Sequence, residues 1–332
     1  MEMSPMFSIE QKLKDIGRLN LANLPTPIHF QEKLSQKLGV ELYVKRDDLS
    51  GVVLSGNKIR KLEYLLFDAQ QKQADVVLTC GGVQSNHCRA TVFAARQLGI
   101  DAEVFLRGLD GQPSSGNLLL CRLADAKTHS LTQETYMQRD ELMLTRAEAL
   151  QKEGRTPYLI PEGGSNALGS LGYIGSMLEI HQEVADADFI ITAVGSGGTL
   201  AGLLAGAELA DSKAKVIGVP VCDDGEIFCA RVNDILNALK TLIPEVTTQA
   251  RREHFCDGHV GLGYAQATND ELGQIRSVVK ESGLVLDPVY TNKAFSGMLQ
   301  MIADQRIPAN SKVLFLHTGG IFGLAPFADR LS

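Results

Sequence analysis

The chain has 332 residues, with 32 basic and 39 acidic side chains and a formal net charge of −7. Its length suggests two domains, and ordinary shares of apolar (44%) and charged (21%) residues exclude a disordered or fibrous chain. No apolar run approaches the roughly 20 residues that span a bilayer, and the N-terminal segment lacks the apolar core of a secretory signal. The sequence also lacks a basic run that would bind nucleic acid. We therefore expect a cytoplasmic protein with neither membrane nor nucleic-acid partners.

Six cysteines are spread along the chain, at positions 80, 88, 121, 222, 229 and 256. None belongs to a C-x-x-C pair, and a chain of this length does not need a disulfide framework in order to fold. We therefore predict that all six are reduced thiols and that the protein has no metal site.

Short apolar segments that end in polar or glycine-rich turns alternate with helical patterns from about residue 40 onward. The predicted strands and their polar ends cover residues 41–48, 74–80, 102–108, 156–164, 188–198, 215–221 and 312–320. This alternation is typical of an α/β fold with a parallel sheet, in which ligands bind at the carboxyl ends of the strands. Four segments at strand ends combine Gly with Ser, Thr, Asn or Lys, and we predict that they converge on one crevice: residues 45–63, 79–87, 193–202 and 316–320.

Lys58 lies in the first of these segments, within Ser55–Leu62. Three basic residues begin a helical pattern here, although the positive end of a helix dipole disfavours cations. One interpretation is a basic surface turn. The other is functional, because local rules are often broken at functional sites, and a lysine with a lowered pKa beside a phosphate forms a Schiff base with a carbonyl cofactor.

The segment Gln84–His87 opens the next helical pattern, directly after a strand that ends in glycines. Its N–H groups and the Ser85 hydroxyl are suited to a carboxylate, whereas the alternative is that Ser85 or Asn86 only caps the helix. His87 fits a helix residue better than a catalytic base.

The loop GSGGT joins an apolar strand to a helix rich in Ala, Leu and Gly, and N–H groups at such a helix start bind anions. It is not a dinucleotide fingerprint, because Leu200 occupies the place of the third glycine, and it lacks the G-K-[ST] of a Walker A loop. A lone phosphate, as on a small cofactor, fits better than a nucleotide. The loop residues are Gly195, Ser196, Gly197, Gly198 and Thr199.

Six motifs, in order along residues 20–325, give the chain a close resemblance to the pyridoxal-phosphate enzymes of fold type II. They resemble the branch of D-cysteine desulfhydrase and 1-aminocyclopropane-1-carboxylate deaminase. The motifs are Lys45–Asp48, Gly56–Glu63, Gln84–His87, Gly195–Thr199, Asp287–Thr291 and His317–Gly320.

The resemblance implies a tryptophan-synthase-β-like fold, with two open, mostly parallel, twisted sheets flanked by helices. It implies a large, discontinuous cofactor-binding domain at residues 1–59 and 166–332. A small α/β domain would be inserted at residues 60–165, and the protein would form a homodimer.

The resemblance also implies a role for each candidate residue. Lys58 would hold pyridoxal 5'-phosphate through a Schiff base, and Asn86 would face the 3-oxygen of that cofactor. The phosphate would lie on the loop Gly195–Thr199 and on Lys61. The substrate carboxylate would lie on Ser85, Asn86 and His87, and two aromatic side chains would flank the substrate, namely Tyr264 and Tyr290.

Thr291 and Thr318 distinguish the two sides of this branch. Relatives of the cyclopropane deaminase are expected to have Glu and Leu at these positions, and two threonines are the pattern of the desulfhydrase side. A carboxylate beside the pyridine nitrogen keeps it protonated and strengthens the electron sink, whereas a hydroxyl leaves it largely neutral. A neutral ring suffices when a good leaving group departs from Cβ, but opening an unactivated cyclopropane needs the stronger sink.

We therefore predict β-elimination from a small amino acid, first of all conversion of D-cysteine to pyruvate, ammonia and sulfide, with Lys58 as the base at Cα. Ser85 is either a second proton-transfer group or only a carboxylate ligand. Other leaving groups would make the enzyme an L-cysteate sulfo-lyase, a serine dehydratase or a lyase for chlorinated alanine, and the cyclopropane deaminase is less favoured. The alternatives of another class are a nicotinamide oxidoreductase, which Leu200 disfavours, and a non-catalytic binder of a small anion.

Overall fold

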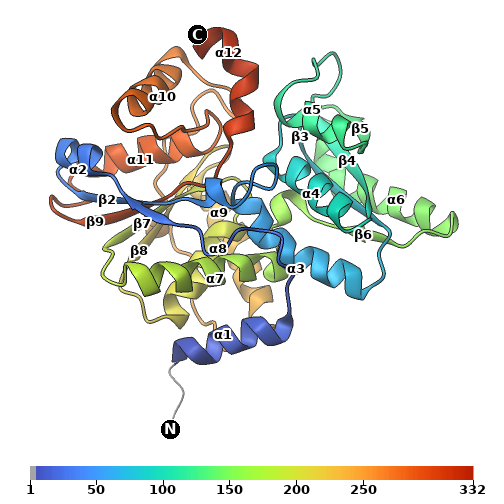
Figure 1. Cartoon of the computed structure of the whole chain (residues 1–332), viewed down its shortest axis with the longest axis horizontal. Coiled ribbons are helices and arrows are strands. Elements are labelled where there is room, and N and C mark those ends of the chain that lie inside the picture. The colour runs from blue at the N-terminus through green and yellow to red at the C-terminus, as the bar shows by residue number, and fades with distance from the viewer. Residues whose placement is uncertain (1–4, 332) are drawn as a thin grey trace.

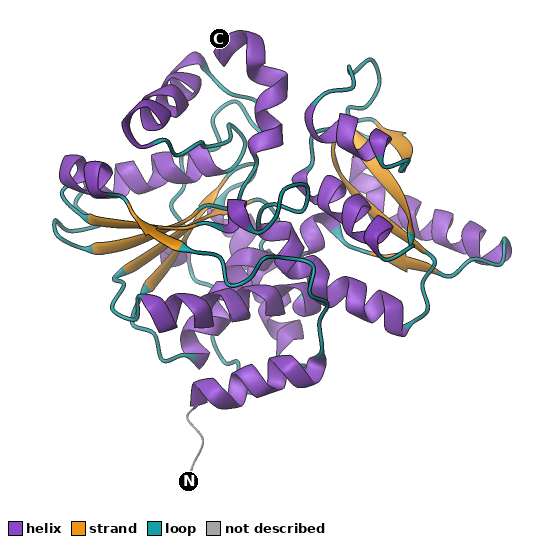
Figure 2. Cartoon of the chain, viewed as in Figure 1, coloured by secondary structure: helices purple, strands orange, loops and turns teal. Residues whose placement is uncertain are grey.

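Two separate sheets organise the protein in this computed structural model, which describes residues 5–331 (Figures 1 and 2). The five-stranded sheet has the order β1-β2-β9-β7-β8, and the four-stranded sheet has the order β5-β4-β3-β6. Among the described residues, every strand pair is parallel except β1 with β2. The predicted α/β fold with two mostly parallel sheets flanked by helices is therefore confirmed.

The larger sheet contains β1 (Ile28–Phe30), β2 (Glu41–Lys45), β7 (Phe189–Val194), β8 (Lys215–Pro220) and β9 (Lys312–Leu316). The smaller sheet contains β3 (Val76–Gly82), β4 (Asp101–Arg107), β5 (Lys127–Leu131) and β6 (Pro157–Leu159), all within the predicted small domain at residues 60–165. The bounds of the domains themselves stay a prediction. The helices are α1 (Pro5–Ile16), α2 (Glu32–Leu38), α3 (Asn57–Gln71), α4 (Asn86–Gln97), α5 (Gly116–Leu123), α6 (Arg139–Lys152), α7 (Ala167–Glu183), α8 (Gly198–Leu209), α9 (Gly225–Leu239), α10 (Asn269–Ser282), α11 (Thr291–Ala303) and α12 (Ala328–Leu331).

Helices cover both faces of the larger sheet, and the period of two along a strand sends its side chains to the two sides in turn. On β7, Ile190 and Val194 join the core formed with α7, α8 and α9. Phe189, Ile191 and Ala193 join the opposite core, formed with α2, α10 and α11. All six residues of β7 are buried, which explains why this strand reads as an unbroken apolar run.

The helices α7 and α8 pack closely because α8 presents glycine to its neighbour. A Cβ atom on Gly202 would lie 2.3 Å from the carbonyl oxygen of Ser170, and one on Gly206 would lie 2.6 Å from Cβ of Met177. Larger residues at these two positions would push the helices apart. This contact supports the N-terminus of α8, which follows β7 at the edge of the sheet where the site lies.

The two parts of the chain meet at the carboxyl ends of their strands, and α3 runs from the larger part toward the smaller one (Figure 1). No helix within residues 5–331 has both the length and the apolar character needed to cross a membrane. All six cysteines are free, as predicted.

Candidate active site

A narrow pocket draws lining residues from all four of the polar strand-end segments. The structure thus brings together segments that are as far apart as residues 57 and 318, as the sequence predicted. The lining consists of Asn57, Lys58, Asn86, Ala193, Val194, Gly195, Ser196, Gly197, Thr199, Leu200, Tyr290 and Thr318.

A larger cavity of about 380 Å³ adjoins this pocket and shares four lining residues with it: Lys58, Gly195, Ser196 and Tyr290. Ser85, His87 and Tyr264 also line the larger cavity. The pocket and the cavity therefore form one site, with Lys58 at their junction, and most candidate residues from the sequence lie around it.

Lys58 belongs to the first turn of α3, which is fixed against the end of β9. The N–H group of Asn57 donates to the carbonyl oxygen of Thr318 at 3.0 Å. Gly56 has a φ of 98°, and a Cβ atom there would lie 2.7 Å from the same oxygen, so glycine is required at this contact. Burial lowers the pKa of Lys58 to about 8, against an opposing effect of the Glu162 charge. This amine is therefore uncharged over much of the mildly alkaline range.

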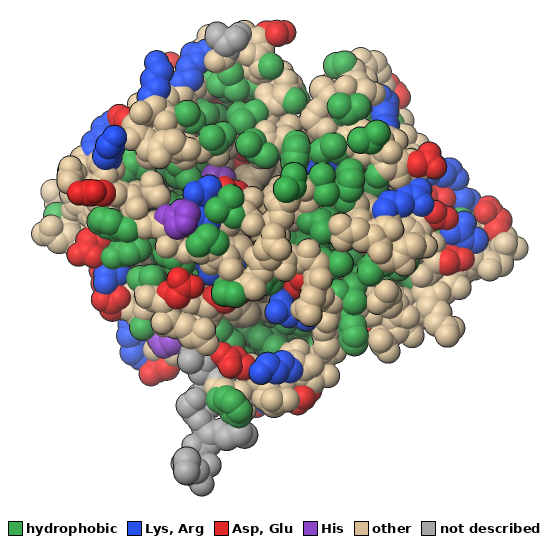
Figure 3. Space-filling model, in the orientation of Figure 1, with side chains coloured by type: hydrophobic (Ala, Val, Ile, Leu, Met, Phe, Trp, Pro, Cys, Tyr) green, Lys and Arg blue, Asp and Glu red, His purple; other side chains and the backbone are tan. Residues whose placement is uncertain are grey.

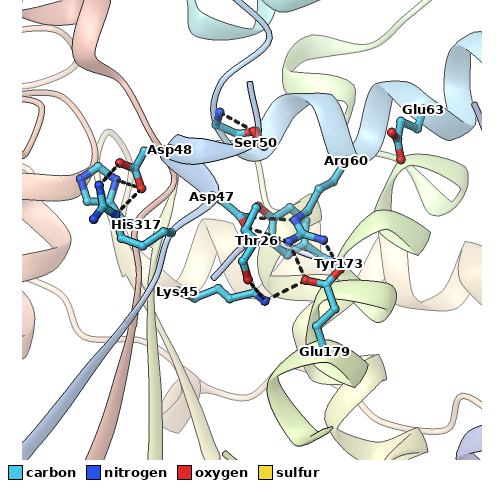
Figure 4. Close-up of polar contacts among 12 residues, drawn as sticks. Thr26, Lys45, Asp47, Asp48, Ser50, Arg60, Glu63, Tyr173, Glu179 and His317 are labelled. Carbon is cyan, nitrogen blue, oxygen red and sulfur yellow. Dashed lines mark hydrogen bonds and ion pairs between the residues drawn. The ribbon is translucent and has the colours of Figure 1, made fainter. Parts of the chain in front are cut away.

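The other two cations of this turn are also buried, so the interpretation as a basic surface turn is wrong. Arg60 and Lys61 are each 1% exposed. Figure 4 shows Arg60 inside a network of buried polar groups, between Asp47 and Glu179, which it contacts at 2.9 Å and 2.8 Å. Although burial alone would raise the pKa of Asp47, the Arg60 charge and several hydrogen bonds hold it below its usual value. The network joins the end of β2, the start of α3 and α7.

Lys61 lies beside the start of α8. Its Nζ atom donates to Oγ of Ser165 at 3.0 Å and to the carbonyl oxygen of Gly163 at 3.3 Å. The Ser165 hydroxyl also accepts the N–H of Gly198 at 3.2 Å and lies 2.8 Å from Oγ of Ser196. Since a helix leaves its first N–H groups without intrahelical partners, this turn combines free donors with an amine, as an anion site requires.

Asn86 lines the narrow pocket, and its amide orientation is set by Asn117. Nδ2 of Asn117 donates to the backbone carbonyl oxygen of Gln84 and to Oδ1 of Asn86, both at 2.9 Å. The carbonyl oxygen can only accept, so the atom of Asn117 at this position is its nitrogen, and the contacting atom of Asn86 is its oxygen. Asn86 is left with its NH₂ group for a partner in the pocket.

Ser85 and His87 lie at the start of α4. Ser85 caps the helix, and its Oγ accepts the N–H of Cys88 at 3.2 Å. The His87 ring is buried, with Nε2 2.8 Å from Oγ1 of Thr79, and Nδ1 has no hydrogen-bond partner within residues 5–331. Burial, together with the charges of Lys58 and Lys61, holds the pKa of His87 well below its usual value. The ring therefore adds no positive charge, and a carboxylate here would depend on the helix start and the Ser85 hydroxyl.

Tyr264 and Tyr290 share a hydrogen bond of 2.7 Å between their hydroxyl groups. Burial raises the pKa of both phenols, so both stay protonated near neutral pH. A Cβ atom on Gly82, at the end of β3, would lie 2.8 Å from the Tyr264 ring. Glycine at this strand end therefore lets Tyr264 lie over the edge of the smaller sheet while it contacts Tyr290 of the larger part.

Thr291 and Thr318, which the sequence pattern predicts to discriminate within the branch, differ in their surroundings. Thr318 lines the narrow pocket. The Thr291 hydroxyl is buried at the start of α11, where it donates to Oδ1 of Asp287 at 2.8 Å and accepts the Asp287 N–H at 2.7 Å. The proton of the Thr291 hydroxyl is thus already used, whereas Thr318 lies in the pocket lining, together with the hydroxyl groups of Ser196, Thr199 and Tyr290.

The sequence alone did not single out Asn117, Ser165, Glu162 or Arg107. Asn117 follows Gly116 at a helix start, and nothing in its local sequence marks its contact with Asn86. Ser165 had a usable signal, because it follows a strand end with two glycines, the same pattern as in the four chosen segments. Glu162 and Arg107 line the larger cavity.

The family described as pyridoxal-phosphate dependent enzyme matches residues 19–319. A bifunctional D-cysteine desulfhydrase/1-aminocyclopropane-1-carboxylate deaminase, mitochondrial, of Arabidopsis thaliana is 41% identical over 327 residues, which cover 94% of this chain and 80% of that protein. A D-cysteine desulfhydrase of Klebsiella pneumoniae is 37% identical over 333 residues, covering 97% and 99%. A crystal structure described as an ACC deaminase homologue superposes with a TM-score of 0.91 at 36% identity and covers 99% of both chains.

Proposed function

The chain belongs to the pyridoxal-phosphate dependent enzyme family, and from this premise we propose that it catalyses β-elimination from a small amino acid, with D-cysteine converted to pyruvate, ammonia and sulfide. The D-cysteine desulfhydrase of Klebsiella pneumoniae supports this choice, whereas the Arabidopsis relative carries the names of both activities. The observation that carries it is the narrow pocket, which combines the weakly basic Lys58 amine with a lining that contains no carboxylate.

The side chains of the site fit pyridoxal phosphate. Lys58 supplies an amine for its aldehyde, and the start of α8 with Lys61 supplies donors for its phosphate. Asn86 presents an amide NH₂ to the pocket, which suits the 3-oxygen of the ring. Held by these residues, the cofactor would supply an aldehyde for the substrate amine and an electron sink for the negative charge that develops at Cα.

Lys58 is the base at the substrate Cα. Its lowered pKa means that a large share of the amine is free to accept a proton at mildly alkaline pH. The amine takes the Cα proton, and the Cβ–S bond then breaks with its electron pair moving to sulfur, which leaves as hydrosulfide. Water releases pyruvate and ammonia from the remaining fragment.

The start of α4 binds the substrate carboxylate and so fixes which bond at Cα points to Lys58. The N–H groups of Asn86 and His87 precede the first intrahelical bonds, and Ser85 adds a hydroxyl. Ser85 also lines the larger cavity, which places it in the same space as Lys58 and gives it access to a second proton transfer. Tyr264 and Tyr290, both protonated, flank the β-substituent.

Glu162 and Asp223 line the adjoining cavity, but no described residue in the lining of the narrow pocket is a carboxylate, and this favours a substrate with a good leaving group. Without an acid beside it, a pyridine nitrogen stays largely neutral and withdraws electrons less strongly. Of Thr291 and Thr318, it is Thr318 that lines the pocket and would supply a hydroxyl to this nitrogen. Ring opening of an unactivated cyclopropane is accordingly disfavoured.

A pyruvate-release screen of the cofactor-loaded protein tests the proposal. The substrates are D-cysteine, L-cysteine, D-serine, β-chloro-D-alanine and 1-aminocyclopropane-1-carboxylate, with 2-ketobutyrate measured for the last. We expect turnover of D-cysteine and β-chloro-D-alanine. Release of 2-ketobutyrate at a comparable rate would instead assign the deaminase reaction and refute the argument from the carboxylate-free pocket.

A homodimer in the cytoplasm completes the proposal. Figure 3 shows apolar side chains gathered across the middle of one face of the protein, with charged side chains toward its margins. Exposed apolar side chains of this size and number are typical of protein interfaces. The large apolar side chains that are exposed in the structure include Val52, Leu119, Leu123 and Ile321. Light scattering of the purified protein tests the dimer.

A further inference from the structure

Arg107 is the last residue of β4 and lines the cavity beside Lys58, yet the reaction proposed above gives it no task. It pairs in register with Gly82 of β3, so it lies at the strand ends that face the site. Its guanidinium lies 4.5 Å from the centre of the Tyr136 ring and 5.1 Å from that of Tyr264. Two aromatic rings thus hold this cation at the wall of the cavity.

Arg107 differs from the other arginines of the same cavity in having no acidic partner. Arg139 lies 3.6 Å from Glu162, and Arg231 lies 2.8 Å from Asp223. Within residues 5–331, no ion pair and no side-chain hydrogen bond involves Arg107. The two paired arginines are balanced, and the cavity keeps the positive charge of Arg107.

The amine and the carboxylate of an amino-acid substrate already have their places in this site, at the cofactor with Lys58 and at the start of α4. Arg107 is a further cation and lies against Tyr264, whose hydroxyl bonds Tyr290 beside Lys58. The part of the substrate left to meet Arg107 is the β-substituent. A guanidinium binds planar or trigonal oxyanions through paired N–H groups, so it selects an acidic group at that position.

We infer that Arg107 determines substrate specificity by binding an acidic β-substituent, which extends the substrates of this site to alanines that carry a sulfonate at Cβ. The inference rests on the proposed function. For the sulfonate, Cα–H breaks with its proton passing to Lys58, and Cβ–S breaks with its electron pair leaving on sulfur. With one water, the sulfonated amino acid then becomes pyruvate, ammonium and hydrogensulfite, and no oxidant or reductant is needed.

The test compares a charged and an uncharged β-substituent in the wild type and in Arg107→Gln. The substrates are cysteate and β-chloroalanine, each as both enantiomers. We expect kcat/KM for cysteate to fall by about 30- to 100-fold in the variant, as for loss of a charge-assisted pair, while kcat/KM for β-chloroalanine changes less than about threefold. Arg107→Lys keeps the positive charge but lacks the planar guanidinium, so its kcat/KM for cysteate should lie between those of the wild type and Arg107→Gln.

A matched control removes one positive and one negative charge from the same cavity, so that the net charge of the cavity does not change. The double variant Asp223→Asn/Arg231→Gln deletes an existing ion pair, and it should leave the ratio of the two kcat/KM values within about threefold of the wild type. Retained turnover of β-chloroalanine shows that each variant is folded and loaded with cofactor.

Binding of an unreactive ligand gives a second measurement that does not depend on turnover. Calorimetry compares 3-sulfopropanoate with butanoate, which share the carboxylate but differ in the second charge. We expect the wild type to prefer the sulfonate, more strongly at low salt, and Arg107→Gln to lose this preference.

Three results would overturn the inference. In the first, the wild type turns over β-chloroalanine but neither enantiomer of cysteate, which leaves the proposed function standing. In the second, Arg107→Gln weakens both substrates equally, as a purely structural residue would. In the third, the two ligands bind with equal affinity to wild type and variant. Failure of every substrate, cysteine and β-chloroalanine included, would refute the proposed function, and the calorimetry would still decide the role of Arg107.

Discussion

Nδ2 of Asn117 donates a hydrogen bond of 2.9 Å to Oδ1 of Asn86, and this contact from α5 decides which end of the Asn86 amide the narrow pocket receives. Asn117 is itself completely buried and is held by Gln84, through its own backbone N–H and its side chain. Asn117, which does not line the pocket, thus sets the orientation of the Asn86 amide, which does. Substitution of Asn117 tests this arrangement.

Asn117→Asp keeps the shape of the side chain but replaces the donor with a second acceptor. The carboxylate would repel both the Gln84 carbonyl oxygen and Oδ1 of Asn86, so the Asn86 amide would turn over. We expect kcat/KM to fall by about 5- to 30-fold, as for one lost hydrogen bond, and the visible absorbance of the bound cofactor to shift. Asn237→Asp, an exposed change on α9, is the control. An unchanged spectrum with full activity would contradict this role.

Lys58→Ala should remove both the covalent attachment of the cofactor and the base at Cα. We expect the visible absorbance of the lysine-bound cofactor to disappear, and turnover to fall at least about 1,000-fold, in the range of a lost catalytic base and nucleophile. Lys72→Ala, an exposed lysine at the end of the same helix, should change neither. If the variant still shows this visible absorbance after free cofactor has been removed by dialysis, the assignment of Lys58 is refuted.

Uptake of pyridoxal phosphate by the cofactor-free protein should depend on pH through Lys58. Only the uncharged amine attacks an aldehyde, and burial lowers the pKa of Lys58 to about 8 from the ordinary 10.5. The rate should therefore rise about tenfold per pH unit below that pKa and level off above pH 8 to 9. Stopped-flow absorbance measures it. A rate that still rises steeply at pH 10 would show that the amine is not perturbed.

Thr318→Val and Thr291→Val should have opposite effects on activity and stability. Thr318 lines the pocket, so its loss should lower kcat/KM by about fivefold or more with a small change in unfolding free energy. Loss of the Thr291 hydroxyl leaves the Asp287 N–H without its acceptor and removes one donor to the buried carboxylate, and should cost about 1–3 kcal/mol of stability. Activity and urea unfolding of both variants, measured side by side, decide the matter; the reverse pattern would place Thr291 at the cofactor.

Arg60→Met should destabilise the fold, because it leaves Asp47 and Glu179 without their shared cation. Breaking a buried pair from one side costs about 3–5 kcal/mol. The lowered pKa of Asp47 means that its ionised form stabilises the protein above the usual carboxyl range, and that this contribution is lost as the pH falls. The difference between wild type and variant in urea unfolding should thus shrink on acidification. Lys72→Met, which removes the exposed pair with Asp68 and the contact of Lys72 with the Tyr158 ring, should cost less than about 1 kcal/mol.

Much of this protein can be predicted from local sequence. The alternation of apolar runs with helical patterns indicates the α/β class, because strand and helix periods are local properties. The glycine-rich strand ends indicate where a ligand binds, since parallel strands present their carboxyl ends on one edge. The resemblance of six ordered motifs then identifies the cofactor, which the family match confirms.

Other features depend on contacts between residues that are distant in the chain, and only the tertiary structure decided them. Arg60 and Lys61 read equally well as a surface turn, and their burial follows from α7 and from the loop at Ser165. The sequence pattern treats Thr291 and Thr318 alike, whereas the partner of each hydroxyl depends on packing. Arg107 stands out only because, within residues 5–331, no ion pair involves it. Local sequence patterns thus determine the class of fold and the place of the site. The orientation of polar side chains and the pairing of buried charges depend instead on how the elements of the two sheets pack together.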